Sequence, residues 1–252
     1  MSLDTGLHPI DAPGTSERSW AAWPWLTAPP GAGLTEVARR VVAEIASAVV
    51  VAAHPDDEVL GVGGLISMLA AAGARLRLVA VTDGERSHRG HVDPGELARQ
   101  RTAETAAALR ALGAPAAEVI RLRLPDSEVA SHEDELTAAL ASLSRGFDAC
   151  FAPWDHDLHP DHEAAGRAAR RASPARLYYY PVWMWHWASP ADPRVPWNQA
   201  LRVPLPPRAA AMKRAAIGCF ASQTEDRGGG LGPVLTPAMI AHFTRAMEVL
   251  LP

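Results

Sequence analysis

The sequence predicts an α/β fold with a mostly parallel sheet of at least five strands. Between residues 47 and 171, apolar strand-like runs alternate four times with helical segments at short spacing, which is the pattern of βαβ units. The first run, at 48–53, is small, β-branched and uncharged, as expected for a strand buried on both faces. His-Pro-Asp-Asp-Glu follows at 54–58. Because open α/β sheets bind ligands beyond the carboxyl ends of their strands, this cluster is a candidate site.

The composition fits one large α/β domain or two small ones. The chain has 252 residues, 48% of them hydrophobic, with a net charge of -4 and a pI near 6.2. This charge gives no electrostatic case for binding nucleic acid or an anionic membrane. We see neither a secretory signal nor an apolar stretch that could span a bilayer, so we expect a cytoplasmic protein without membrane insertion. Cys150 and Cys219 fit buried thiols of a reducing compartment.

The N-terminal region is expected to pack on the main domain. Residues 1–33 are rich in Pro, Gly, Ser and Trp, and Trp20, Trp23 and Trp25 favour a packed arm. Apolar residues at helical spacing predict a helix over 34–45. We therefore expect an arm and helix at 1–46 and a single domain at 47–252.

Within that domain, strands and helices are expected in alternation. The predicted strands cover 47–53, 75–81, 119–124 and 148–153; the predicted helices cover 61–71, 96–112, 132–144 and a stretch ending at 171. Gly113 is a good residue to follow the second helix. Gly-Val-Gly-Gly at 61–64 lacks the rest of a dinucleotide fingerprint, so we interpret it as room for close backbone packing.

The C-terminal third is aromatic and less regular. Residues 177–187 predict a strand whose alternation puts three tryptophans on one face, in the core or lining a sugar or apolar pocket, with the core favoured. Residues 188–208 predict a loop, 207–221 a helix and 236–250 a last helix.

Two histidine clusters carry the candidate chemistry. His54 and Asp57 are three residues apart, as are His159 and His162, and both pairs follow predicted strands. Two imidazoles and one carboxylate form a catalytic zinc set with positions open for water and substrate. Asp56 can take a proton from the activated water, and His159 can protonate a leaving amine or stabilise an oxyanion. The alternative interpretation of His-Pro-Asp-Asp-Glu at 54–58 is a solvated helix start, because acidic residues are favoured in the first turn of a helix.

Several neighbouring residues have weaker signals. Asp161 is well placed to accept a ring N–H from a histidine. Glu58 fits a helix-start charge or a support for the ligands better than a ligand. The loop residues Asp155, His156 and Asp157 either shape the rim and support the ligands or form a polar turn, and the sequence leaves this open. Arg86 and Arg89 could contact a substrate hydroxyl or phosphate, but a solvated face is favoured for them.

Taken together, these motifs resemble the PIG-L (LmbE-like) family of zinc-dependent de-N-acetylases. The resemblance rests on Ala-His-Pro-Asp-Asp-Glu at 53–58 and His-Pro-Asp-His at 159–162, and spans about residues 47 to 224. Weaker matches are Arg101-x-x-Glu104 and Ser222-Gln223. Asp157 stands where members of thiol-cofactor pathways carry a tyrosine, which argues against the usual cofactor-precursor substrates.

The resemblance implies a Rossmann-like three-layer α/β/α fold and removal of an N-acetyl or other N-acyl group from a glucosamine-type sugar. It implies one zinc ion (Zn2+) per chain on His54, Asp57 and His162, a general base at Asp56, and acid or oxyanion duty for His159. Four residues are then expected to support the ligands or contact the substrate: Asp161, Asp157, Arg89 and Arg101.

Rival functions belong to other classes. One is a non-catalytic sugar-binding module on the same fold, which the intact ligands, acid and base argue against. Others are a different single-metal amidohydrolase and a phosphoesterase, although two-metal phosphoesterases need more ligands and bridging carboxylates. The expected partner is a small molecule or glycoconjugate that bears an N-acylated amino sugar.

Overall fold

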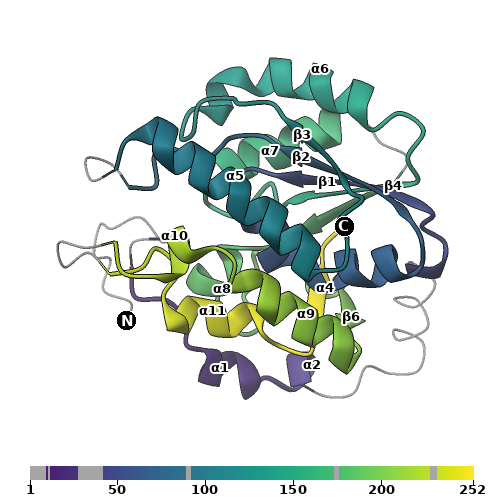
Figure 1. The fold of residues 1–252 in the computed structure, drawn as a ribbon. Coiled ribbons are helices and arrows are strands. Elements are labelled where there is room, and N and C mark those ends of the chain that lie inside the picture. Colours follow the sequence, from purple (N-terminus) through teal and green to yellow (C-terminus); the bar gives the residue numbers. More distant parts are fainter. Residues whose placement is uncertain (1–9, 11, 28–41, 89–91, 173–175, 228–231) are drawn as a thin grey trace.

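A central parallel sheet with helices on both faces organises the molecule (Figure 1). The computed structural model describes residues 10, 12–27, 42–88, 92–172, 176–227 and 232–252. The sheet has five strands in the order β3-β2-β1-β4-β5, all paired in parallel. They are β1 (Ser47–Ala52), β2 (Arg75–Ala80), β3 (Glu118–Arg121), β4 (Ala149–Pro153) and β5 (Leu177–Tyr180). The predicted α/β/α fold with a mostly parallel sheet is confirmed.

The predicted alternation of strand and helix is also present. The connecting helices are α4 (Asp57–Ala71), α5 (Pro94–Ala111), the 3₁₀ turn η1 (Val129–His132), α6 (Glu133–Leu143) and α7 (Pro160–Arg171). Helices α6 and α7 pack together on one face, and α4 and α5 lie on the other with α9 (Pro207–Ile217). Every residue of β1 is buried, as its apolar sequence predicted.

Helix α4 begins at Asp57, so the predicted start at Gly61 is wrong. The glycines lie inside the helix and allow close packing, as expected. A Cβ added at Gly61 would lie 2.1 Å from the Tyr180 ring, and one at Gly64 would lie 2.5 Å from Leu205. Real side chains do not tolerate such distances, so these positions need glycine.

The C-terminal third corrects three predictions. The aromatic segment is a strand only to Tyr180, and α8 (Met184–Trp187) follows, because the Asp157 carboxylate accepts the backbone N–H groups of residues 182–184 and turns the chain. The predicted loop at 188–208 contains β6 (Leu201–Pro204). The predicted last helix is α11 (Pro237–Phe243) followed by β7 (Met247–Leu250), since residues 247–250 pair antiparallel with β6.

The described part of the N-terminal region packs on these C-terminal elements. It forms α1 (Glu17–Ala21) and α2 (Pro24–Thr27). The fully buried Trp20 indole donates to the Trp185 carbonyl at 2.9 Å. Most of the helix predicted over 34–45 lies outside the described residues, and the division of the chain at residue 46 stays a prediction.

Two further expectations concern cysteines and membranes. Cys150 is buried and Cys219 partly buried, and both are free thiols. Among the helices in the described ranges, none has the length and apolar character needed to cross a bilayer.

Candidate active site

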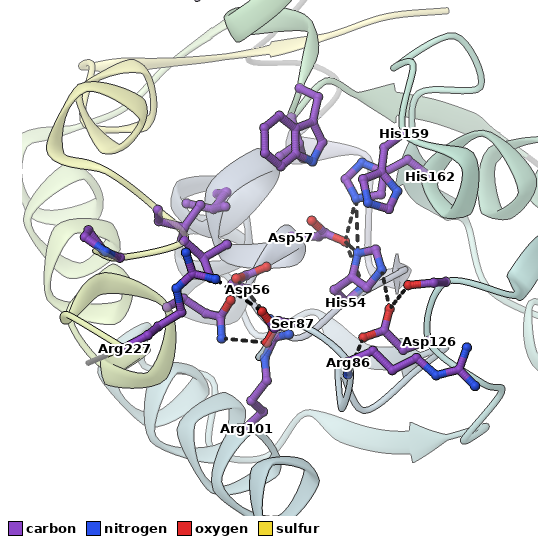
Figure 2. A pocket seen from close by; sticks show the side chains of 18 residues that line it. His54, Asp56, Asp57, Arg86, Ser87, Arg101, Asp126, His159, His162 and Arg227 are labelled. Carbon is purple, nitrogen blue, oxygen red and sulfur yellow. Dashed lines mark hydrogen bonds and ion pairs between the residues drawn. The ribbon is translucent and has the colours of Figure 1, made fainter. Parts of the chain in front are cut away.

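The two histidine clusters meet at the carboxyl edge of the sheet. His54 and Asp57 follow β1, whereas His159 and His162 begin α7 after β4. Because β1 and β4 are neighbouring parallel strands, their following loops lie side by side. The residues line one cavity of about 330 Å³, shown in Figure 2.

Three ligand-type atoms form a nearly equilateral triangle. His54 Nδ1 lies 3.3 Å from His162 Nε2 and 3.5 Å from Asp57 Oδ2, and the last two atoms are 3.3 Å apart. Tetrahedral ligands bound about 2.0–2.1 Å from one zinc ion stand ~3.3–3.4 Å from each other. The side chains of His54, Asp57 and His162 therefore fit one such ion without rearrangement.

Hydrogen bonds on the outer side of each imidazole direct a free nitrogen into this triangle. Asp157 Oδ2 lies 2.8 Å from His162 Nδ1, and Asp161 Oδ2 lies 3.1 Å from His54 Nε2. A carboxylate accepts an N–H, so the outer nitrogen of each ring carries a proton, and the inner nitrogen is the one that can give up its proton to bind a metal ion. Asp161 thus accepts a ring N–H, as the sequence suggested, and Asp157 does so too.

Both supporting carboxylates are held by backbone N–H groups. Asp157 is fully buried and accepts from Val182, Trp183 and Met184 at 3.1, 2.9 and 2.8 Å. Asp161 accepts from Ser127 at 2.8 Å and from Val129 at 3.1 Å. Fixed carboxylates fix the two rings that they contact.

Two other groups of ligand-type atoms lie within 4.8 Å of one another in the described ranges. One is His54, His159 and His162; the other is His54, Asp126 and Asp161. The second uses His54 Nε2, which the hydrogen bond to Asp161 marks as the protonated nitrogen. A metal ion in the second group would therefore compete with this hydrogen bond, whereas the triangle of His54, Asp57 and His162 uses His54 Nδ1.

The charges of the site favour a cation. Burial opposes charge on His162, but the nearby Asp57 charge and the Asp157 hydrogen bond raise the pKa of His162 to about 9. Burial likewise opposes charge on Asp57, and the His162 charge outweighs it and holds the Asp57 pKa well below its usual range. A site that raises imidazole pKa values and keeps a buried carboxylate ionised attracts positive charge.

Asp56 has the properties of a general base. Its side chain is buried but lines the cavity, and Arg101 contacts its Oδ2 at 3.1 Å. Burial raises the pKa of Asp56 to about 7, although the Arg101 charge opposes this increase. The backbone of Asp56 has φ 124°, a strained conformation for a residue with a side chain, and such strain clusters at functional sites.

His159 faces the same space as a neutral ring. Its Nδ1 accepts the Asp161 backbone N–H at 3.3 Å, which places the ring proton on Nε2. Burial and the charges of His162 and His54 lower the pKa of His159 to about 2. A neutral imidazole with a free Nε2–H can donate to a developing oxyanion.

The other predicted residues differ in whether they line the cavity. Arg86 lines the cavity, with its guanidinium on Glu128. Arg89 lies outside the described residues. Asp155 pairs with Arg170 at 2.8 Å and His156 is 71% exposed, so these two form a polar turn away from the cavity. Glu58 is fully buried behind Asp56, whose N–H it accepts, and supports the loop.

Sequence reasoning missed several residues of the cavity. Asp126 lies 3.4 Å from His54 Nε2, and its place after the third predicted strand could have identified it. Its carboxyl pKa is lowered, because hydrogen bonding to His54 outweighs burial. Other residues that were missed come from loops without periodicity: Ser87, Ser127, Val182, Arg227 and 233–235.

The motifs Arg101-x-x-Glu104 and Ser222-Gln223 support the site from behind. Arg101 donates to the carbonyls of Pro55 and Gly84 as well as to Asp56. Glu104 accepts from Ser222 N at 2.8 Å and Ser222 Oγ at 2.6 Å, which ties α10 (Ala221–Thr224) to α5.

Comparisons with known proteins match this chain to one family of deacetylases. Residues 49–173 match the family described as PIG-L: GlcNAc-PI de-N-acetylase. A stretch of 66 residues is 44% identical to a 1D-myo-inositol 2-acetamido-2-deoxy-alpha-D-glucopyranoside deacetylase of Kineococcus radiotolerans. That stretch is 24% of this chain and 18% of the relative, so the chain matches under a fifth of the relative's length.

Two solved structures share the fold. The conserved protein TT1542 from Thermus thermophilus is 28% identical with a TM-score of 0.54, over 71% of this chain and 80% of that one. The N,N'-diacetylchitobiose deacetylase from Pyrococcus horikoshii is 22% identical with a TM-score of 0.59, over 77% and 78% of the two chains.

Proposed function

This chain belongs to the PIG-L family through its match at residues 49–173, and on that basis we propose that it is a metal-dependent N-deacylase. Its reaction is hydrolysis of the amide of an N-acetyl or other N-acyl group on a glucosamine-type sugar. The observation that supports this best is the triangle of His54, Asp57 and His162 with the buried Asp56 beside it.

We assign the metal position to His54, Asp57 and His162, and the metal to zinc, one ion per chain. Two imidazoles and a carboxylate are a catalytic zinc set that leaves positions open. When bound, the ion supplies water activation and polarisation of the amide carbonyl.

The protein side chains then handle the protons. Asp56, with its pKa raised to about 7, accepts a proton from the attacking water. His159 donates Nε2–H to the amide oxygen as negative charge develops there. Protonated Asp56 can return its proton to the departing amine, which balances the hydrolysis. Arg101 holds the Asp56 carboxylate in place during both transfers.

The substrate class follows from the relatives and the cavity. One relative deacetylates an acetylated glucosaminyl inositol, and a structural neighbour deacetylates diacetylchitobiose. A cavity of about 330 Å³ accommodates a sugar unit with a short acyl group. We include in the proposal that residues 47–252 act as one domain with the arm packed on it, and that the protein is cytoplasmic. The free thiols Cys150 and Cys219 support that location.

The first test replaces a proposed ligand. His162→Ala removes one of three protein ligands, so zinc affinity is expected to fall by orders of magnitude, together with hydrolysis. Zinc per chain is measured by elemental mass spectrometry, and products by mass spectrometry after incubation with a panel of N-acetylated glucosaminides. His156→Ala, an exposed histidine of the same loop, is the matched control and should keep both properties.

Each outcome has a clear meaning. Zinc binding by His162→Ala as tight as that of the unmodified chain would disprove the ligand assignment. Zinc and sugar binding by the unmodified chain without any deacylated product would instead favour a non-catalytic sugar-binding module.

A further inference from the structure

One tryptophan of the C-terminal third leaves the core and lines the cavity. Trp183 follows β5 and is partly exposed, whereas its neighbours Val182, Met184 and Trp185 are at most 5% exposed. It lies beyond the segment matched by the family, which ends at residue 173. The expected strand would have placed it on a common face with Trp185 and Trp187; the turn into α8 separates them.

The Trp183 ring stacks beside one histidine of the site, His159. Its indole is inclined by 22° to the His159 ring, with the ring centres 6.2 Å apart. The His159 ring in turn lies 4.9 Å from the His54 ring and 4.5 Å from the His162 ring. The indole therefore extends the wall that begins at the proposed metal ligands.

The main chain of Trp183 is fixed by the carboxylate that orients His162. Asp157 Oδ2 accepts from both Trp183 N and His162 Nδ1, at 2.9 and 2.8 Å. Its Oδ1 accepts from Val182 N and Met184 N. One fully buried residue thus sets the position of the indole relative to the metal ligand.

The lining of the cavity combines two kinds of group. Histidines and carboxylates supply polar groups, and apolar side chains come from Trp183, Leu60, Val182, Pro233, Val234 and Leu235. A pyranose ring has the matching character, because its hydroxyl groups point outward from the ring edge while its C–H bonds form an apolar face. Such a face covers an indole and displaces water from it. The methyl of an acetyl group is too small to cover an indole.

We propose that Trp183 is the platform on which the pyranose ring of the substrate stacks, and that Asp157 is the residue that positions this platform relative to His162. The inference rests on the proposed function and adds the residue that recognises the sugar. It predicts that substrate selection depends on a side chain outside the segment matched by the family.

The first experiment measures binding. Diacetylchitobiose is titrated by calorimetry into the full zinc-loaded chain carrying Asp56→Asn, which slows hydrolysis, alone and combined with Trp183→Ala, Trp183→Phe or Trp25→Ala. Loss of the stacking surface should weaken binding about ten- to hundred-fold in Trp183→Ala, and an aromatic replacement should restore most of the affinity. Trp25→Ala is the control, because this half-buried tryptophan belongs to α2 and does not line the cavity.

The second experiment separates recognition of the sugar from the chemistry. The hydrolysis of diacetylchitobiose is compared with that of N-methylacetamide, a small amide with no ring that could stack on the indole. Trp183→Ala should raise KM for the sugar at least about ten-fold, with a much smaller effect on kcat for the sugar and on kcat/KM for the small amide. Asp157→Asn should lower kcat for both substrates through His162 and raise KM for the sugar alone.

The outcomes distinguish this inference from the proposed function. If the unmodified chain deacetylates the sugar and Trp183→Ala binds it equally well, the platform assignment is wrong while the function stands. Equal effects of Trp183→Ala on both substrates, or loss of zinc from it, would show a structural role and also overturn the inference. If the unmodified chain neither binds nor hydrolyses N-acetylated amino sugars, the proposed function fails and the platform with it.

Discussion

Asp56 is the residue at which burial, strain and charge converge. It has a positive φ, a buried carboxyl on the cavity and a pKa raised to about 7. Asp56→Asn keeps the size of the side chain but cannot accept a proton, so kcat is expected to fall by ~10²–10⁴-fold. Zinc content should stay at the level of the unmodified chain.

This prediction is checked by steady-state kinetics beside metal analysis. Turnover near that of the unmodified protein would make Asp56 a support for Asp57. The base would then be sought at Asp126, which lines the same cavity. Asp155 and Asp157 do not suit that role, because one pairs with Arg170 and the other lies behind His162.

Arg101 adjusts the pH at which Asp56 becomes a base. Its positive charge favours the carboxylate form of Asp56 and opposes the increase in pKa caused by burial. Activity should rise with pH as Asp56 loses its proton. In Arg101→Gln this acidic limb should move to higher pH, since the neutral form of Asp56 is then favoured. The limb is measured from kcat/KM between about pH 5 and about pH 9, which brackets a pKa near neutrality.

Matched substitution of another arginine gives the control. Arg86→Gln removes a cavity arginine that pairs with Glu128 and should leave the acidic limb in place. An unchanged limb in Arg101→Gln would assign the limb to a group other than Asp56.

At this scale the sequence predicts the residues that directly follow strands and little else. The four residues His54, Asp57, His159 and His162 lie at most nine residues after the end of β1 or β4, so the order of the strands brings them together. Trp183 depends on the hydrogen bonds of Asp157, a contact between residues 26 positions apart. No local pattern encodes that contact.

Among the elements, α4 contains a break in its helical hydrogen bonding, and two residues distant in sequence bond to the backbone groups that the break leaves free. Val62 has non-helical angles, φ −135° and ψ 22°, in the middle of the helix. Gly64 N–H and Leu60 C=O would pair in an uninterrupted helix. Here Glu248 of β7 accepts from the N–H groups of Gly64 and Leu65, at 2.7 and 2.9 Å. Lys213 of α9 donates to Leu60 C=O at 2.7 Å.

Glu248 and Lys213 also bond to each other at 2.7 Å, both almost fully buried. Glu248→Ala leaves a buried ammonium and two buried N–H groups without their acceptor. The free energy of unfolding is therefore expected to fall by about 3–5 kcal/mol, measured by urea denaturation. Glu118→Ala removes a half-exposed strand glutamate paired with Arg77 and should cost about 0–1 kcal/mol. Equal losses in the two variants would contradict a role of Glu248 in the break.

The difference between local patterns and contacts distant in sequence explains which elements could be predicted. Strands β1 to β4 and their helices were predicted because apolar spacing is a local signal. Strands β6 and β7 are four residues each and pair with each other across more than forty residues of chain. Helical spacing over 236–250 was a genuine local signal, but for residues 247–250 pairing with β6 prevails.

For the molecule as a whole, the aromatic arm joins the two ends of the sequence. Trp20 and Trp23 contact Trp197, with ring centres 5.9 and 4.8 Å apart, and Trp20 also meets Trp185 at 5.1 Å. In Figure 1, α1 and α2 lie against the C-terminal elements and away from the central sheet. The arm therefore stabilises the region that carries Trp185, two residues after the proposed platform.

The contact between α1 and the C-terminal region depends on a carboxylate. Glu17 accepts from His242 Nδ1 at 2.7 Å and from Arg245 Nε at 2.8 Å. Burial alone would raise the pKa of Glu17, but the hydrogen bonds from Arg245 and His242 outweigh it and lower the pKa below its usual value of 4.5. A carboxyl whose pKa is lower in the folded state stabilises the fold above its unfolded pKa, and that contribution disappears as the pH falls through the folded value.

Glu17→Gln should therefore destabilise the protein at neutral pH and cease to do so in acid. Because Glu17 is partly exposed, we expect a loss of about 1 kcal/mol at about pH 7, or ~2–4 °C in Tm. Thermal unfolding is followed between neutral pH and about pH 3. Both proteins are metal-free, so that loss of a metal ion in acid does not contribute to the difference between them. Glu44→Gln, at the exposed pair with Arg176, serves as control and should change Tm little at any pH. A difference between Glu17→Gln and the unmodified chain that persists undiminished in acid would show that Glu17 holds the arm by packing, not by its charge.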